Sequence, residues 1–403
     1  MVLDIETANR STGRLNKRLD PTQTGSEAAK LSRDLRQNIV GQDEAIEQVV
    51  SMYQTYLAGM ISPGRPVGNF LFLGPTGSGK TRLVEALAES LAGDMRAVIK
   101  IDCAEFQHSH EIAKLIGSPP GYLGHRETHP LLSQEVLNQY HTEKLRLSFV
   151  LFDEIEKASD SLWNLLLGIL DKATLTLGDN RRVDFSQAMV FMTSNLGALE
   201  MSSILRPNIG FGSVELERKL SAGSIDDNIA NRMKRAGIAA ARRKFTPEFM
   251  NRIDKTVVFR PLGETELREI LSLELNRLQK RILSAPNGVP FVFSLTDAAK
   301  EHILGEGTDA KYGARHLKRA IDRSLVHLLS NLVASGQIRS GDFIRVDYDE
   351  MLNRMTFVKE AEELPERILA SIVDTSFDPP PTWQSASASV EPIRAAGVRR
   401  LSR

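Results

Sequence analysis

The fold is decided by one stretch of the chain, Phe70-Leu71-Phe72-Leu73-Gly74-Pro75-Thr76-Gly77-Ser78-Gly79-Lys80-Thr81. It joins a short apolar run, typical of a buried strand, to a complete G-x-x-x-x-G-K-[ST] loop that a helical pattern follows. Glycines in such a loop let the backbone form a nest whose N–H groups converge on phosphate oxygens. A plain glycine-rich turn, the alternative, would need neither the strand before it nor the helix after it. We therefore predict that residues 74–81 bind a nucleoside triphosphate.

Lys80 and Thr81 supply the side chains that this chemistry needs. Lys80 reaches the β- and γ-phosphates, and the hydroxyl of Thr81 is the type of ligand that completes the shell of Mg²⁺. The helix expected over residues 81–91 directs its positive N-terminal dipole at the same phosphates. The loop is therefore expected to bind nucleotide together with Mg²⁺.

A second apolar run, Phe149-Val150-Leu151-Phe152, ends in two carboxylates, Asp153 and Glu154. A continuous apolar run is typical of a central parallel strand, because helices cover both its faces. Acidic residues at its carboxyl end would lie at the crevice where such sheets bind ligands. We expect Asp153 to hold Mg²⁺ through water and Glu154 to orient or deprotonate an attacking water; an ordinary polar strand end is the alternative. Another apolar run, Met189-Val190-Phe191-Met192, leads to Asn195, whose amide we expect to contact the γ-phosphate or the water.

Strand-like and helical segments alternate as far as about Leu262, which predicts an α/β domain with a parallel central sheet flanked by helices. Beyond Pro261, short strand patterns appear and apolar residues recur at helical spacing in two stripes. These stripes are Leu267, Leu271, Leu275, Leu278, Ile282 and Leu317, Ile321, Leu325, Leu328, Leu332. We expect a flexible arm over residues 1–34, a large domain over 35–262, a smaller, mainly helical domain with short strands over 263–360, and a disordered tail over 361–403.

Composition disfavours several classes of protein. The chain has 403 residues, and its 51 basic residues balance its 51 acidic ones, so no general attraction to nucleic acid or to an anionic membrane is expected. No apolar run approaches membrane-spanning length, and residues 1–20 lack the apolar core of a signal peptide, which predicts a cytoplasmic protein. Cys103 is the only cysteine, so no internal disulfide can form, and a packed thiol is favoured over a catalytic one.

Seven strings of this sequence resemble the second, carboxyl-proximal ATPase module of the Clp-type AAA+ ring ATPases, between about Ile39 and Glu360. They are Val40-Gly41-Gln42, Phe70 to Gly77, Gly117-Ser118-Pro119-Pro120-Gly121-Tyr122-Leu123-Gly124, Leu151 to Ala158, Met192 to Gly197, Pro247 to Asp254 and Tyr312-Gly313-Ala314-Arg315. The resemblance implies the AAA+ P-loop fold with a small carboxyl-terminal lid domain. It also implies hydrolysis of ATP with Mg²⁺ by subunits in a ring, which we expect to be a hexamer.

The resemblance assigns further residues to the nucleotide. It implies that Arg252 is the arginine finger donated to the γ-phosphate of a neighbouring subunit, where its fixed charge offsets transition-state charge. Without the family, Arg252 would be interpreted as a surface ion pair. Arg315 is similar to the second sensor, which contacts phosphate from the small domain of the same subunit. Ile39, Val40 and Gly41 are similar to the wall on the adenine side.

Tyr122 bears most directly on function. In the family, an aromatic residue on a glycine-flanked loop projects into the central pore and grips an extended polypeptide. Gly121 and Gly124 fit such a loop tip, and an aromatic face can grip backbone without reading sequence. Leu123 stands where the family usually has Val, and the next residues are less rich in glycine, so the grip is expected to differ. A buried structural tyrosine is the alternative.

Ile209, Gly210 and Phe211 lie where protease-associated Clp ATPases carry an apolar loop that docks on the ClpP-type peptidase ring. An exposed Ile-Gly-Phe is costly unless a partner covers it. The alternative is a loop that packs on the module's own core.

Two other features are given no functional role. The histidines match no familiar zinc spacing, so we expect no metal cluster there. The basic run between Arg232 and Lys244 follows acidic residues and flanks a helix, so a solvated face is favoured over a nucleic-acid site.

We therefore predict a homo-oligomeric, ATP-driven unfoldase that threads protein substrates through a central pore, as the ATPase subunit of a Clp-type protease. Two alternatives stay open: a stand-alone chaperone or remodelling ATPase without a peptidase, and a nucleic-acid-remodelling AAA+ ATPase. The sequence shows neither a first ATPase module nor the coiled-coil insertion of the two-ring disaggregases, which counts against the chaperone. A nucleic-acid remodeller would have no use for Tyr122.

Overall fold

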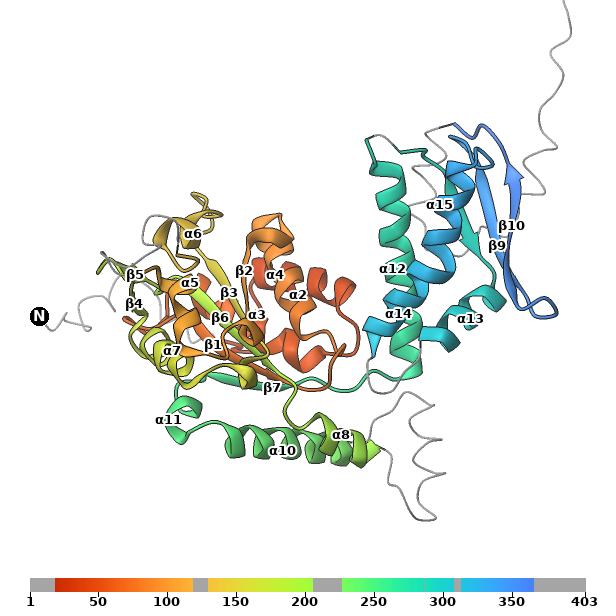
Figure 1. Ribbon diagram of the computed structural model, residues 1–403. Coiled ribbons are helices and arrows are strands. Elements are labelled where there is room, and N and C mark those ends of the chain that lie inside the picture. The colour runs from red at the N-terminus through yellow and green to blue at the C-terminus, as the bar shows by residue number, and fades with distance from the viewer. Residues whose placement is uncertain (1–18, 119–129, 206–226, 287, 308–312, 366–403) are drawn as a thin grey trace, which may run out of the picture. The chain divides into compact units, whose positions relative to one another are not determined.

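The computed structural model describes residues 19–118, 130–205, 227–286, 288–307 and 313–365. The chain divides into two compact units, Met1–Pro261 and Leu262–Arg403, and each is described by itself. Figure 1 labels the helices and strands of both.

The large unit is built on a five-stranded sheet in which every neighbouring pair of strands is parallel. The strand order is β2-β3-β6-β1-β7. The strands are β1 (Gly68–Leu73), β2 (Val98–Asp102), β3 (Ser148–Asp153), β6 (Ala188–Ser194) and β7 (Lys255–Val258). The apolar runs expected to be buried strands are therefore the three central strands, and the predicted parallel sheet is confirmed.

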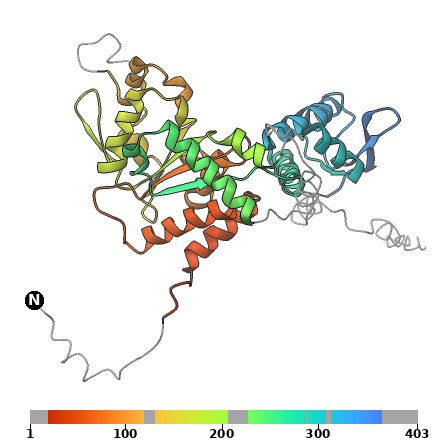
Figure 2. The ribbon, with the colours of Figure 1, turned by 90° about the horizontal axis from the view of Figure 1, so that it is seen from below.

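Helices cover both faces of this sheet, as Figures 1 and 2 show. The α-helices are α2 (Ser26–Asn38), α3 (Asp43–Leu57), α4 (Lys80–Ala92), α5 (Ala113–Ile116), α6 (Gln134–Asn138), α7 (Asp160–Lys172), α8 (Ala198–Leu205), α10 (Asp227–Lys244) and α11 (Pro247–Met250). Short 3-10 turns are η1 (Met95–Ala97), η2 (Cys103–Glu105), η3 (Ser109–Ile112) and η4 (Ile155–Lys157), and a hairpin is formed by β4 (Thr174–Thr176) and β5 (Arg182–Asp184).

Successive residues of the central strands pack into two separate cores. On β1, Phe70 and Phe72 belong to the core with α2, α3 and α4, whereas Leu71 and Leu73 belong to the core with α7 and α10. Side chains of a strand point alternately to opposite faces, so a strand that is apolar at every position must be covered twice. This double cover explains why the sequence shows unbroken apolar runs at these strands.

The amino-terminal boundary of the large unit differs from the expectation of an arm over residues 1–34. Helix α2 already begins at Ser26, and its Ala28, Leu31 and Leu35 are buried in the core beside α3 and α4. The spacing of these three residues puts them on one helical face, and burial of that face holds the segment against the unit. Residues 1–18 lie outside the described part of the chain.

The small unit combines helices with a three-stranded sheet in the order β10-β9-β8. Strands β8 and β9 are parallel, and β9 and β10 are antiparallel. Its elements are α12 (Glu264–Ser284), β8 (Val292–Leu295), α13 (Asp297–Gly307), α14 (Ala314–Ile321), a π-helical turn η5 (Asp322–Val326), α15 (His327–Ala334), β9 (Phe343–Asp349) and β10 (Arg354–Ala361). The smaller domain with helices and short strands is thereby confirmed, while the expected tail lies outside the described residues after position 365.

The second apolar stripe of the small unit differs from the prediction at one position. Leu317, Ile321 and Leu325 are buried as expected, but the next buried residue is Leu329, and Leu328 is only half-buried. The cause is the π-helical turn at Asp322–Val326, which adds a residue to the helical repeat and shifts the buried face.

Candidate nucleotide site

The glycine-rich loop lies between the end of β1 at Leu73 and the start of α4 at Lys80. Its first residue, Gly74, has a φ of +144°, and a Cβ there would lie 2.6 Å from the carbonyl oxygen of Phe259. The N–H of Gly74 donates to the carbonyl of Ser194 at 3.2 Å, which ties the loop to the end of β6. Any side chain at position 74 would therefore displace the loop from the sheet.

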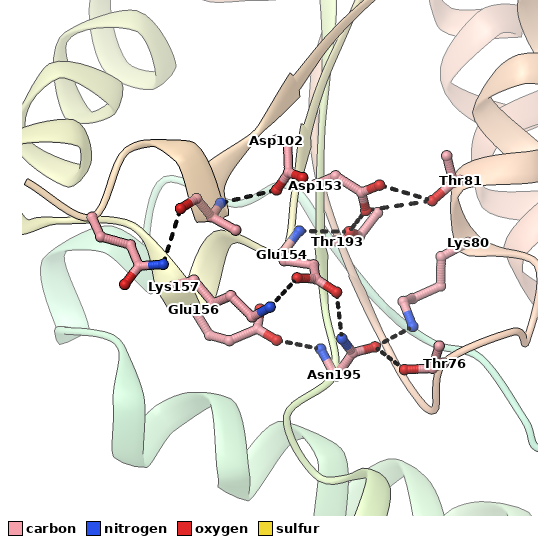
Figure 3. Close-up of polar contacts among 12 residues, drawn as sticks. Thr76, Lys80, Thr81, Asp102, Asp153, Glu154, Glu156, Lys157, Thr193 and Asn195 are labelled. Carbon is pink, nitrogen blue, oxygen red and sulfur yellow. Dashed lines mark hydrogen bonds and ion pairs between the residues drawn. The ribbon is translucent and has the colours of Figure 1, made fainter. Parts of the chain in front are cut away.

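The side chain of Lys80 turns back over its own loop and is 8% exposed. Its Nζ donates to the carbonyls of Gly74 at 2.7 Å and Pro75 at 2.9 Å, and to Oδ1 of Asn195 at 3.0 Å. Figure 3 shows the bond between Lys80 and Asn195. The ammonium group thus lies at the centre of the loop, where phosphate oxygens could replace these acceptors.

Asp153 lies at the carboxyl end of β3, facing the first turn of α4. The hydroxyl of Thr81 is 3.4 and 3.3 Å from the two carboxylate oxygens of Asp153. Thr193, which is buried on β6, donates its hydroxyl to Oδ1 of Asp153, and the same hydroxyl accepts the N–H of Glu154 at 3.1 Å. Thr193 therefore fixes the carboxylate that faces Thr81 (Figure 3).

The oxygens of Thr81 and Asp153 fit the needs of Mg²⁺. This ion prefers oxygen ligands and keeps several waters, so that one or two protein groups and the substrate phosphates complete its shell. Within the described ranges, no group of three or more His, Cys, Asp or Glu residues could hold a metal by itself. A protein cage for a metal is thus not found there, whereas the hydroxyl of Thr81 and the carboxylate of Asp153 lie together beside the glycine-rich loop.

Glu154 has a left-handed backbone, with φ 56° and ψ 48°, directly after the end of β3. Its Oε1 accepts Nδ2 of Asn195 at 3.4 Å, and its carboxylate forms an ion pair with Lys157. Hydrogen bonding to Glu154 raises the pKa of the Lys157 ammonium. The sharp turn separates Glu154 from Asp153, so that Asp153 faces Thr81 and Glu154 faces Asn195 (Figure 3).

Asn195 joins the phosphate-binding loop to this acidic strand end. Its Oδ1 accepts from Lys80 and from the hydroxyl of Thr76 at 3.3 Å, while its Nδ2 donates to Glu154. Its backbone N–H donates to Oε1 of Glu156 at 3.0 Å. One side chain therefore contacts both groups that the γ-phosphate and the attacking water would meet.

The segment predicted to form the adenine-side wall lies against the same loop. Ile39 is buried at the end of α2, and Val40 is half-buried. Gln42 anchors this segment, because its Nε2 donates to the carbonyls of Ser78 at 3.2 Å and Arg260 at 3.0 Å. Residues 39–42 thus lie beside the phosphate-binding loop.

Arg252 lies at the opposite end of β1 from that loop. Its carbonyl accepts Nδ2 of Asn69 at 3.0 Å, and Asn69 is the second residue of β1. The five residue-to-residue steps from Asn69 to Gly74 span roughly 16 Å of extended chain. Its guanidinium pairs with Asp171 at 3.4 Å and with Glu248 at 3.3 Å. The side chain of Arg252 therefore does not take part in its own subunit's phosphate site.

The remaining residues singled out in the sequence lie in the small unit, outside the described residues, or in a core of the large unit. Arg315 is exposed near the start of α14, in the small unit. Tyr122, Leu123 and the Ile209-Gly210-Phe211 string lie outside the described residues. Cys103 is fully buried, and burial raises the pKa of its thiol, which agrees with a packed cysteine.

Four contacting residues were given no role from the sequence: Gln42, Glu156, Lys157 and Thr193. Each lies in a string that carries an assigned residue, so the signal was present as proximity in the sequence. Their roles depend on which strands are neighbours. Pairing of Phe152 with Met192 puts Thr193 beside Asp153, for example, and this register cannot be read from either strand alone.

We expect Thr193→Val to raise the Mg²⁺ concentration needed for half-maximal ATP hydrolysis by about 10- to 100-fold, because a residue that orients a metal-binding carboxylate has effects of this size. Valine keeps the shape of the buried side chain but removes the hydroxyl that bonds Asp153. The measurement is ATPase rate against Mg²⁺ concentration. Thr174→Val, at an exposed threonine on β4, is the matched control, and an unchanged Mg²⁺ requirement in Thr193→Val would contradict the role.

Comparison with known proteins agrees with this geometry. Residues 65–256 match the family model of the AAA domain (Cdc48 subfamily), and residues 262–346 match that of the C-terminal, D2-small domain of ClpB protein. Among relatives, the chaperone protein ClpB of Rhodopirellula baltica is 39% identical over 327 residues, which are 80% of this chain and 34% of the relative. The ATP-dependent Clp protease ATP-binding subunit ClpC of Staphylococcus aureus (strain USA300) is 39% identical over 322 residues, 79% of this chain and 36% of the relative.

A solved structure is also similar. A closed-state cryo-EM reconstruction of Hsp104 with ATPγS and FITC casein aligns with a TM-score of 0.66 and 29% identity, covering 87% of this chain and 55% of that one. The two family models together match more than half of the chain, in the order AAA domain and then D2-small domain. The chain belongs to the Clp-type AAA+ ATPases.

Its matched part resembles the second ATPase module of those proteins, and the AAA domain indicates that it binds nucleotide and hydrolyses ATP. The chain spans about a third of the length of the curated relatives it matches. No helix in the described ranges is long and apolar enough to cross a membrane.

Proposed function

We propose that this chain is a subunit of a ring, expected to be a hexamer, that uses Mg-ATP hydrolysis to unfold and translocate polypeptide. The observation that carries the proposal is the location of Arg252 at the opposite end of β1 from its own phosphate-binding loop. An arginine that completes a phosphoryl-transfer site can be supplied by another chain. A ring gives every loop a neighbouring Arg252, because its head-to-tail interfaces repeat around the closed symmetry.

Within one subunit, the residues divide the work of hydrolysis. Residues 74–81 cradle the phosphates, Thr81 and Asp153 would hold Mg²⁺, and the bound ion would neutralise charge on the phosphates. Glu154 takes a proton from the attacking water, and Asn195 holds Glu154 in place relative to the loop through hydrogen bonds to Glu154 and Lys80. The proposed contribution of Arg315 is contact with phosphate from the small unit, which couples hydrolysis to domain motion.

Tyr122, with Leu123 beside it, is proposed to grip the polypeptide. The support comes from the glycines that flank it and from the Hsp104 structure, which was determined with FITC casein. We place the activity in the cytoplasm, where ATP and protein substrates occur together.

We expect an unfolded protein such as casein to stimulate the ATPase of the full chain, and Tyr122→Ala to abolish that stimulation while leaving basal hydrolysis in place. An aromatic face supplies most of the grip, so Tyr122→Phe should retain stimulation. The measurement is ATPase rate with and without casein or DNA. Stimulation by DNA and not by casein would favour the nucleic-acid-remodelling alternative.

A peptidase partner is proposed for Ile209, Gly210 and Phe211, and the ClpC relative is named as the ATP-binding subunit of a Clp protease. We expect a tagged Glu154→Gln chain, held in its ATP state, to capture a ClpP-type peptidase from native cytosol. Phe211→Ala in the same background should lose it, because an exposed aromatic anchor contributes strongly to docking. Trapped polypeptide without peptidase in both samples would instead indicate a stand-alone unfoldase, the role suggested by the name of the ClpB relative.

A further inference from the structure

Asn69 is a polar residue with no exposed surface at the beginning of an otherwise apolar central strand. Its Nδ2 donates to two backbone carbonyls, those of Leu170 at 3.1 Å and Arg252 at 3.0 Å. Its backbone N–H donates to Oδ2 of Asp254 at 2.8 Å, and its carbonyl accepts the N–H of Asp254 at 2.9 Å. One residue of β1 therefore holds the segment 252–254 through three hydrogen bonds, and a fourth joins it to Leu170.

Arg65 reinforces the same segment from the turn before β1. Its Nη2 donates to the carbonyl of Arg252 at 3.3 Å and pairs with Oδ1 of Asp254 at 3.4 Å. The carbonyl of Arg252 thus receives two donors, and the carboxylate of Asp254 is held on both of its oxygens. The backbone of Arg252 is therefore held both by β1 and by the turn that precedes it.

Helix α7 ties the side chain of Arg252 into the same arrangement. The carbonyl of Leu170, which belongs to the last turn of α7, cannot bond within the helix and instead accepts Asn69. The next residue, Asp171, pairs with the guanidinium of Arg252. Asn69 and Arg252 therefore both contact the last turn of α7. This helix follows Glu154 and η4 in the chain.

The cluster of Arg65, Asn69, Arg252 and Asp254 is not explained by folding stability alone, because it also buries polar atoms that have no hydrogen-bond partner. In the described residues, six buried side-chain nitrogen or oxygen atoms have no hydrogen-bond partner, and three of them are Oδ1 of Asn69, Nε of Arg65 and Nε of Arg252. A buried polar atom without a partner costs folding free energy, so these three atoms reduce the net stability that the hydrogen bonds around Asn69 provide. Polar groups buried at such a cost indicate that the segment around Arg252 has to be held in a defined position.

We propose that Asn69, supported by Arg65, is a positioning residue for Arg252: it fixes the finger to the strand that carries the subunit's own phosphate-binding loop at its other end. The inference rests on the proposed function, in which Arg252 acts on a neighbouring subunit. A change at Asn69 should then impair the neighbour's site and leave the subunit's own site competent.

The test mixes two kinds of subunit, each poorly active alone. Glu154→Gln subunits have an inactive site of their own but an intact Arg252. Asn69→Leu subunits keep all loop residues but lose the amide that holds Arg252, and misplacement of a catalytic group costs about 10- to 100-fold in rate. In a one-to-one mixture, about a quarter of the sites would combine a competent loop with an intact neighbouring finger, so ATPase activity should return to about that fraction. Arg252→Ala subunits mixed in the same way are the reference.

The outcomes separate the two ideas. Recovery in both mixtures, with the nucleotide affinity of Asn69→Leu unchanged, supports the positioning role. Recovery with Arg252→Ala but not with Asn69→Leu would mean that Asn69 acts on its own site, which overturns the role and leaves the proposed function intact. If the mixture with Arg252→Ala subunits does not regain ATPase activity, Arg252 does not act on a neighbouring subunit. The positioning role of Asn69 would then be overturned together with the proposed function.

A second variant decides the matter if Asn69→Leu does not fold. Arg65→Met removes one donor to the Arg252 carbonyl at a side chain that is 36% exposed, so little folding stability depends on it. It should behave as Asn69→Leu does in the mixture, with a smaller loss alone. Arg181→Met, which breaks two surface ion pairs elsewhere in the large unit, is the control that should remain fully active alone. Full activity of Arg65→Met alone would then count against the proposal.

Discussion

Glu154→Gln is expected to lower ATP turnover by at least about a hundred-fold, the contribution of a positioned general base, while ATP binding is retained. The amide has the shape of the carboxylate and keeps an oxygen for Nδ2 of Asn195. What it loses is the ability to take a proton. The ion pair with Lys157, whose side chain is 48% exposed, is also lost, but an exposed pair contributes at most about 1 kcal/mol to folding.

Steady-state ATPase assays combined with nucleotide-binding titrations would test this expectation. Glu135→Gln is the matched control, because Glu135 is an exposed carboxylate of the same unit that pairs with Arg181. Turnover should be unchanged in the control. Near-normal hydrolysis in Glu154→Gln would remove Glu154 from the reaction.

Arg252→Ala is expected to reduce turnover by about a thousand-fold, the lower range for an arginine finger, with little effect on the stability of the isolated chain. Its ion pairs with Asp171 and Glu248 involve partners that are 42% and 62% exposed, so their loss should cost less than about 1 kcal/mol each. A residue that matters far more to turnover than to folding has its main partner elsewhere. Here the expected partner is the γ-phosphate bound by the next subunit.

Thermal unfolding and ATPase assays on the same preparation would separate the two effects. Arg181→Ala removes a similar pair of surface contacts, to Glu135 and Asp179, and should change neither quantity appreciably. A large loss of stability in Arg252→Ala with proportionate loss of activity would indicate a structural arginine instead.

Local sequence was sufficient for the parts of this molecule that depend on neighbours in the chain. The loop at 74–81 and the apolar runs at Phe70 and Phe149 carry their own chemistry and periodicity, so the strands and the phosphate-binding loop could be predicted directly. Carboxyl ends of parallel strands meet at one edge of a sheet, which also brings Glu154 after β3 and Asn195 after β6 into contact.

The contacts that could not be predicted join segments far apart in the chain. Asn69 and Arg252 are separated by 183 positions, and nothing within either string indicates the other. The π-helical turn at Asp322–Val326 was not predicted for a different reason. A stripe drawn at the ordinary helical repeat has no way to include one extra residue, so Leu328 was predicted at a place that Leu329 occupies.

The bonds of Lys80 to its own loop have a consequence for ligand selectivity. Because the carbonyls of Gly74 and Pro75 already surround the ammonium group, binding is an exchange of acceptors in a loop that is shaped in advance. Preorganisation of this kind lowers the entropy cost of association. A ligand without phosphate has no acceptor to offer that is stronger than a carbonyl, whereas an anionic phosphate oxygen forms the stronger, charge-assisted bond. The carbonyls of the loop thus compete with any incoming ligand for Lys80, and this competition favours nucleotides over nucleosides, which carry no phosphate.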